Sequence, residues 1–221
     1  MHLSGEYVFA APRAIVWSAL QDPRVLASVL PGCERLDRVD DHTFEGAIRL
    51  RIGPVQGDYS GRVQLRDLRE PDSFGMQIDG KGQQGFVKAV ATVSLAAEGD
   101  QTRITYTSDA QVGGRIAAVG QRLIETSARA IVKQSLEGLD AAMRERAATA
   151  ASVTLAGGSP EEATAAADAV APTLTDRPSD AAFAATVARE VAKDIIPPLA
   201  RRAIIVLVIL VLTWILLGLL G

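Results

Sequence analysis

The sequence is poor in cysteine and histidine, and each shortage removes a class of function. Cys33 is the only cysteine among the 221 residues, which excludes an intrachain disulfide and a cysteine-ligated iron–sulfur or zinc site. The two histidines, His2 and His42, are far apart in the sequence and have no carboxylate in ligand spacing, so we expect no metal site. A single cysteine is typical of proteins in a reducing compartment.

Neither sign of charge is in strong excess. The net charge of −3 provides no basic face for a nucleic acid, so we expect no nucleic-acid partner. Apolar residues make up 48% and charged residues 22% of the chain, as in folded globular proteins. Residues 1–6 have neither a basic nor an apolar stretch, so we expect no signal peptide.

The last nineteen residues, 203–221, contain no charged side chain and consist mostly of Leu, Ile and Val. As a helix they would be about 28 Å long, close to the ~30 Å of a bilayer core, which predicts one transmembrane helix. Arg201 and Arg202 precede this segment, so the positive-inside rule places the N-terminal domain in the cytoplasm. We therefore expect a single-pass protein of the inner (cytoplasmic) membrane, with a buried core helix as the alternative.

Residues 147–202 are rich in Ala, Thr and Pro and have too few large apolar residues for a core. We interpret them as a linker that contains short amphipathic helices at most. An inert spacer is the alternative. The expected domains are thus residues 1–146, the linker 147–202 and the membrane anchor 203–221.

Alternation of apolar and polar residues predicts several strands in the first domain. The predicted strands cover residues 3–9, 43–52, 59–66, 74–78, 87–95 and 103–112. Two helical regions are predicted, residues 12–30 with a break near Asp22-Pro23, and residues 115–146. This order predicts an α+β fold in which a curved antiparallel sheet wraps around a long C-terminal helix. Small residues on both faces, such as Gly46 and Ser127, fit either close packing or an open cavity between them.

Three local patterns have a structural and a functional interpretation. Residues 80–85 read G-x-G-x-x-G, but a strand follows instead of a helix, so we predict a hairpin turn and no dinucleotide site. Cys33 follows Pro31-Gly32 and has no nearby base, which favours a structural thiol. Basic residues on the polar faces of neighbouring strands form either a solvated surface or a docking patch for an acidic partner. They are Arg49, Arg51, Arg62 and Arg66.

Four segments of the first domain resemble the family of the carbon monoxide dehydrogenase G subunit, which is part of the START-like (SRPBCC) helix-grip superfamily. The Leu-Pro-Gly-Cys sequence at 30–33 and the Gly-Pro-Val-x-Gly-x-x-x-Gly sequence at 53–61 are fairly specific as a pair. The opening at 5–17 and the turn at 80–85 with the strand at 89–93 complete the resemblance. The apolar C-terminus after a variable linker is also similar to this family.

The resemblance implies an accessory protein and not an enzyme. It implies recruitment of a molybdenum carbon monoxide dehydrogenase, or a related hydroxylase, to the membrane, and a cavity for a lipophilic cargo. The resulting hypothesis is a carried respiratory quinone, ubiquinone or menaquinone, with no covalently bound cofactor. The alternatives are an adaptor without a ligand, and an enzyme of the same fold such as a cyclase or hydrolase. The residues expected to line the cavity are Leu30, Phe44, Ile48, Tyr59, Val63, Met76, Ile78, Phe86, Tyr106, Leu123, Ser127 and Ile131.

Overall fold

The structure, a computed structural model, describes residues 1–156 and residue 159. The predicted membrane anchor and most of the predicted linker lie outside the described residues. Within the described part of the chain, none of the helices is both long and apolar enough to cross a bilayer.

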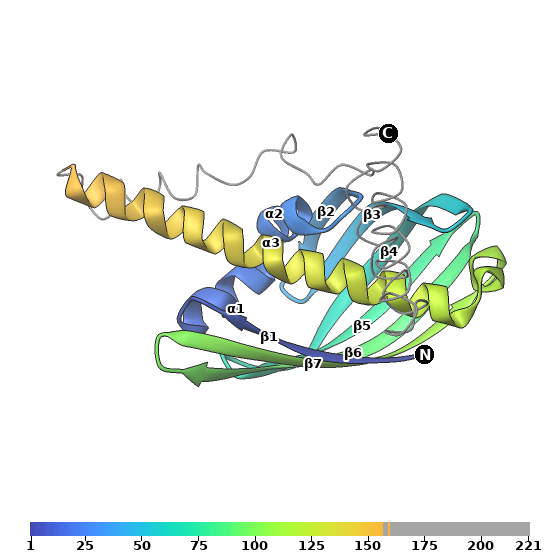
Figure 1. Ribbon diagram of the computed structural model, residues 1–221, viewed down its shortest axis with the longest axis horizontal. Helices are drawn as coiled ribbons and strands as arrows, with labels where there is room; N and C mark the ends of the chain where they lie inside the picture. The colour runs from blue at the N-terminus through green and yellow to red at the C-terminus, as the bar shows by residue number, and fades with distance from the viewer. Residues whose placement is uncertain (157–158, 160–221) are drawn as a thin grey trace, which may run out of the picture.

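Seven antiparallel strands form one curved sheet in the order β1-β7-β6-β5-β4-β3-β2 (Figure 1). Strands β2 to β7 are a meander in chain order, and β1 pairs with β7, so that β1 and β2 are the two edge strands. The strands are β1 His2–Phe9, β2 Cys33–Asp40, β3 Thr43–Ile52, β4 Val55–Arg69, β5 Ser73–Gly82, β6 Gly85–Glu98 and β7 Gln101–Gly113. Strand β2 was not predicted. The turn between β5 and β6 at Gly82–Gly85 confirms the predicted hairpin.

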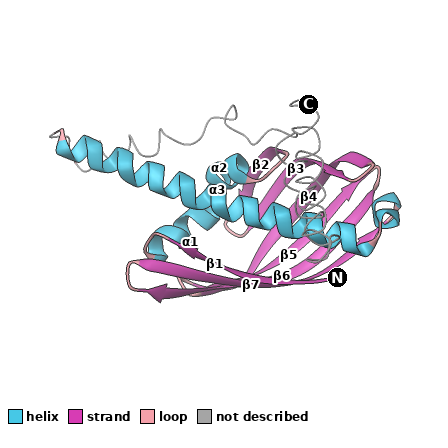
Figure 2. Cartoon of the chain, viewed as in Figure 1, coloured by secondary structure: helices cyan, strands magenta, loops and turns pink. Residues whose placement is uncertain are grey.

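The helices are α1 Arg13–Gln21, α2 Pro23–Val29, a 3-10 turn η1 Arg115–Val119 and α3 Gln121–Leu155. The predicted break lies at Asp22, whose side chain accepts a hydrogen bond from the backbone N–H of Arg24 at 2.9 Å and so caps α2. Helix α3 crosses the inner face of the sheet (Figure 2). It continues past Arg146 to Leu155, so the first part of the predicted linker is helical.

Buried apolar residues form two separate clusters between the sheet and the helices. The large cluster joins α1, α2 and the second half of α3 to the sheet, and contains Phe9, Trp17, Phe74 and Leu139. The small cluster lies at the other end of the sheet and is built on Ile52, Tyr59 and Ile116. The core is therefore divided along the length of α3.

Gly32, in the turn before β2, has a backbone conformation that side chains rarely adopt. Its φ is +71°, and a Cβ at this position would lie 2.1 Å from the carbonyl oxygen of Arg49. Gly99 also has a positive φ, +63°, but nothing lies within 4 Å of the corresponding Cβ position. We expect Gly32→Ala to lower the free energy of unfolding by about 2 kcal/mol or more, and Gly99→Ala by about 1 kcal/mol.

Chemical denaturation of the two glycine variants, followed by circular dichroism, measures this difference. If both variants lost the same free energy of unfolding, the positive φ alone would account for the effect. The close contact with the Arg49 carbonyl would then contribute nothing.

Candidate functional site

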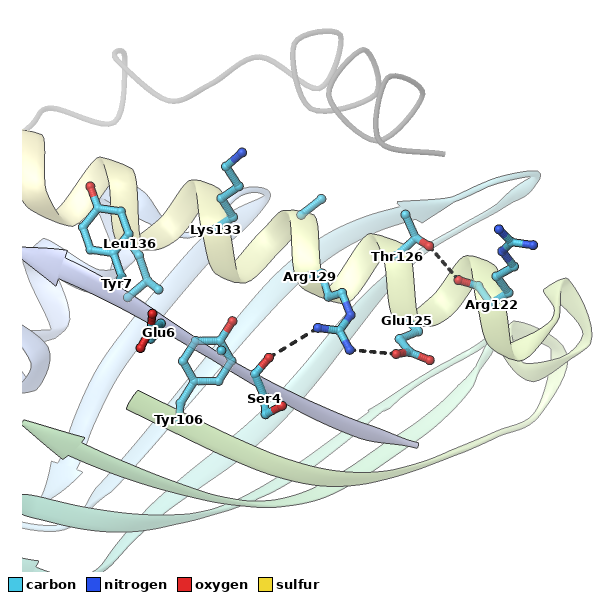
Figure 3. A pocket seen from close by; sticks show the side chains of 12 residues that line it. Ser4, Glu6, Tyr7, Tyr106, Arg122, Glu125, Thr126, Arg129, Lys133 and Leu136 are labelled. Atoms are coloured by element: carbon cyan, nitrogen blue, oxygen red, sulfur yellow. Dashed lines mark hydrogen bonds and ion pairs between the residues drawn. The ribbon is translucent and has the colours of Figure 1, made fainter. Parts of the chain in front are cut away.

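A cleft opens between the edge strand β1, its neighbour β7 and the flank of α3 (Figure 3). Its volume is about 580 Å³, within the range of small-molecule sites. We call it the β1–α3 cleft. It is lined by Ser4, Gly5, Glu6, Tyr7, Tyr106, Arg122, Glu125, Thr126, Arg129, Ala130, Lys133 and Leu136.

Two side chains of α3 form hydrogen bonds with β1 and with the residue that follows it. Arg129 donates to the carbonyl oxygen of Ser4 at 3.3 Å and to the Glu125 carboxylate at 2.9 Å (Figure 3). Further along α3, the Asp140 carboxylate accepts from the backbone N–H of Ala10 at 3.1 Å. Eleven residues separate these two side chains, or about 16 Å along the helix axis.

Asp140 is a buried carboxylate with several donors. Its residue is 5% exposed. Besides Ala10, it accepts from the Tyr7 hydroxyl at 3.3 Å and forms an ion pair with Arg144 at 2.6 Å. Burial, and then the negative charge of Asp140, raise the pKa of Tyr7, so the phenol stays protonated and donates. The carboxylate thus fixes the end of β1 to α3.

Tyr106 lies in the cleft with a hydroxyl that has no hydrogen-bond partner among the described residues. Gly5, its cross-strand neighbour on β1, leaves room for the ring, since a Cβ there would lie 2.3 Å from the Tyr106 hydroxyl oxygen. Burial raises the pKa of Tyr106, while the charge of Arg129 partly opposes the shift. The hydroxyl is therefore a protonated donor at neutral pH.

The cleft adjoins the core. Three of its lining residues, Tyr7, Tyr106 and Leu136, also contact the large cluster. The two acidic residues of the cleft are each paired with an arginine, Glu125 with Arg129 and Glu6 with Arg103. The inner wall is therefore apolar and aromatic, and the rim carries neutralised carboxylates.

Most residues expected to line a cavity lie between the sheet and α3. Strand register places Ile48, Tyr59, Val63, Met76, Ile78 and Tyr106 on the face that α3 covers. Leu123, Ser127 and Ile131 lie on the buried stripe of α3, Leu30 ends α2, and Phe44 is part of the large cluster.

Several of these residues face the interior but are only partly buried. Ile78 in the middle of β5 and Ile131 in the middle of α3 belong to neither cluster. Both are only half-buried, as are Val63 and Met76. Among the described residues, the buried hydroxyls of Tyr59 and Ser127 and the buried Gln134 Oε1 have no hydrogen-bond partner. Burial raises the pKa of Tyr59, which keeps its hydroxyl protonated.

Phe86 differs from the prediction, because it lies on the outer face of the sheet. Val87, Ala89 and Ala91 face α3, so strand alternation turns Phe86 away from it. Its side chain is exposed, with 42% of its surface accessible, and covers the outer side of Gly113. Phe86 therefore cannot line a cavity between sheet and helix.

The predicted basic patch on the outer face is partly neutralised. Arg49 pairs with Asp58 at 2.7 Å and with Glu34 at 3.0 Å, and Arg62 pairs with Glu45. These intrachain pairs favour the solvated surface over a docking site for an acidic partner. Cys33 is buried, and the described residues contain no group of His, Cys, Asp and Glu suited to a metal ion.

The sequence profile of one family matches the domain that carries these features. It is described as CoxG, the G subunit of carbon monoxide dehydrogenase, and it matches residues 5–144. The chain belongs to the CoxG family. This membership confirms the resemblance, and the family name implies association with carbon monoxide dehydrogenase. No curated protein matches the chain.

Solved structures share the fold of this CoxG-family protein. A conserved protein from Geobacillus kaustophilus is 26% identical, with a TM-score of 0.62 over 65% of this chain and 95% of that one. A START superfamily protein from Mycobacterium smegmatis is 15% identical, with a TM-score of 0.51 over 65% and 97%. The Zhui aromatase/cyclase from Streptomyces sp. R1128 is 13% identical, with a TM-score of 0.53 over 66% and 95%. The fold is therefore START-like, as predicted.

Family and fold together suggest an accessory protein that binds a hydrophobic ligand. An aromatase/cyclase, which is an enzyme, shares this fold, although proteins of this family and fold are generally accessory or binding proteins. The sequence did not predict the β1–α3 cleft. The alternation of Gly5, Tyr7 and Phe9 was a signal that could have placed Tyr7 on the inner face.

Proposed function

We propose that this CoxG-family protein binds a respiratory quinone between α3 and the sheet. In this proposal it links a molybdenum carbon monoxide dehydrogenase, or a related hydroxylase, to the membrane respiratory chain. The protein itself is not an enzyme here. The dehydrogenase oxidises carbon monoxide with water to carbon dioxide, and the two electrons and two protons released reduce the quinone to a quinol.

The observation that carries the proposal is the incomplete packing at the middle of α3. Large apolar side chains in a filled interior each contact many others and belong to one contiguous core. Ile78 on β5 points toward the helix side of the sheet, and Ile131 lies in the middle of α3. Both residues lie outside the two clusters and are only half-buried. An isoprenoid tail is an apolar chain that would complete these contacts.

Polar groups of the same interior support a ligand with carbonyl oxygens. A buried hydroxyl without a partner costs free energy, and such groups call for an explanation. The Ser127 hydroxyl on α3 is such a group, and the Tyr106 hydroxyl is a further donor without a partner among the described residues. A quinone offers two carbonyl acceptors on an otherwise apolar molecule, which suits a mostly apolar site with a few donors.

A larger side chain in the middle of α3 tests the proposal. We expect the purified full chain to retain a quinone that organic extraction and mass spectrometry detect. We expect Ile131→Trp to lower the retained quinone at least about tenfold, because the indole takes the space of the tail. Ile15→Trp on α1 is the matched control, since Ile15 is 53% exposed and its replacement should leave the quinone content unchanged.

The opposite result has a clear meaning. If wild-type protein contains no quinone and added ubiquinone or menaquinone does not bind saturably, the carrier function is wrong. An adaptor that only recruits the dehydrogenase is then the remaining function. Co-elution of the quinone-free protein with carbon monoxide dehydrogenase would support that adaptor.

The membrane part of the proposal rests on the sequence. The predicted anchor at 203–221 and the arginines before it would hold the domain on the cytoplasmic side of the inner membrane. A tethered domain stays close to the bilayer that stores the quinone. This arrangement would let the domain exchange quinone with the membrane and meet the dehydrogenase from the same side.

A further inference from the structure

We infer that the β1–α3 cleft holds the polar head group of the ligand, through a hydrogen bond from Tyr106 beside the guanidinium of Arg129. This inference rests on the proposed function and locates one end of the ligand. The head group must offer an oxygen acceptor, such as a quinone carbonyl. The apolar remainder of the ligand then extends inward between α3 and the sheet.

The three tyrosines of the chain differ in what their hydroxyls can do. Tyr7 already donates to Asp140. Tyr59 is 5% exposed, and its hydroxyl is closed off within the small cluster. Tyr106 alone combines a hydroxyl without a partner among the described residues with a position in an open cleft.

Arg129 adds a second hydrogen-bond donor beside Tyr106, so that this part of the cleft favours a ligand atom that accepts hydrogen bonds. Its side chain extends from α3 toward β1 and lies near the Tyr106 hydroxyl (Figure 3). Its hydrogen bonds to Ser4 and Glu125 use two of the five guanidinium N–H groups. A cation next to a phenol attracts the partial negative charge of a carbonyl oxygen, and hydrogen bonds from charged donors are the stronger ones.

The walls of the cleft fit a head group with an attached apolar tail. Tyr7, Tyr106 and Leu136 continue from the cleft into the large cluster, so a tail can follow an apolar surface inward. Gly5 carries no side chain, so the Tyr106 ring lies directly over β1 at the wall of the cleft. A ring of quinone size is well within the 580 Å³ available.

The experiment compares two probes on three variants of the full chain in detergent. The probes are ubiquinone-1, which carries the head group and a short tail, and squalene, an isoprenoid hydrocarbon without carbonyl groups. Isothermal titration calorimetry measures both affinities for wild type, Tyr106→Phe, Tyr7→Phe and Tyr59→Phe. Each variant keeps its aromatic ring and loses one hydroxyl.

We expect Tyr106→Phe to weaken ubiquinone-1 binding about five- to tenfold and to leave squalene binding unchanged. Tyr7→Phe should lower the melting temperature, because its hydroxyl donates to Asp140, and should weaken ubiquinone-1 binding less than Tyr106→Phe does. A larger effect of Tyr59→Phe, or no effect of Tyr106→Phe, would overturn this inference and leave the proposed quinone binding intact. Absence of ubiquinone-1 binding in the wild type would overturn both.

Discussion

Replacing Phe9 with alanine is expected to lower the free energy of unfolding by about 4 kcal/mol. Phe9 ends β1, has no exposed surface, and is the largest fully buried side chain among the residues that the structure describes. Its ring lies 5.0 Å from that of Tyr7, centroid to centroid, within the large cluster. The substitution removes this apolar surface and leaves a cavity that the surrounding helices and strands close only in part.

The control for Phe9 is a second phenylalanine on the outer face. Phe86→Ala should cost about 1 kcal/mol or less, because 42% of the residue is already exposed. Urea denaturation of both variants, monitored by circular dichroism, gives the two values. Equal losses at both positions would contradict the placement of Phe86 outside the core.

Replacing Asp140 with alanine is expected to lower the free energy of unfolding by about 3 kcal/mol. The change leaves the backbone N–H of Ala10 and the hydroxyl of Tyr7 without their acceptor in a part-buried place. It also removes the ion pair with Arg144, whose side chain is 63% exposed, so this pair contributes little. The end of β1 should then detach from α3 more often than the rest of the sheet opens.

Hydrogen exchange at Ala10, compared with global denaturation, tests this local effect. Glu137→Ala is the matched control, because Glu137 is an exposed carboxylate on the same helix. That variant should change the free energy of unfolding by less than about 0.5 kcal/mol. An Asp140→Ala protein as stable as the Glu137→Ala protein would show that the carboxylate does not secure β1.

Local pattern was enough to predict most of the fold. Period-two alternation depends only on neighbouring residues, and it predicted β1 and β3 to β7. It failed for β2, where charged residues occupy both faces of an edge strand and no apolar face exists to reveal the period. The predicted helix from residue 115 begins instead as the separate turn η1, because Gly120 interrupts it with a φ of +94°.

The cleft could not be predicted in the same way. It lies between β1 and the flank of α3, which are more than a hundred residues apart in the chain, so no local pattern relates them. Only the packing of α3 across the sheet brings Arg129 and Ser4 together. Of the twelve residues predicted to line a cavity, Tyr106 is the one that also lines this cleft.

The wrong placement of Phe86 has a simple origin. It adjoins Val87, and both side chains are apolar, so composition alone suggests that both are buried. Strand geometry allows only one of two consecutive side chains on a given face. The run Val87, Ala89, Ala91, Val93 had already defined the inner face, and strict alternation would have assigned Phe86 to the outer one.

The hydrogen bonds from Arg129 and Asp140 of α3 to β1 and the residue after it also affect self-association of the protein. An edge strand with free backbone N–H and C=O groups can recruit the same strand of another copy and start polymerisation. Here Arg129 donates a hydrogen bond to the carbonyl oxygen of Ser4, near the start of β1. Asp140 accepts a hydrogen bond from the N–H of Ala10, just after the end of β1. The opposite edge strand, β2, carries the charged residues Glu34, Arg35, Asp37 and Arg38, which would have to lose water against the strand of another copy. At high protein concentration, these features would keep the copies apart.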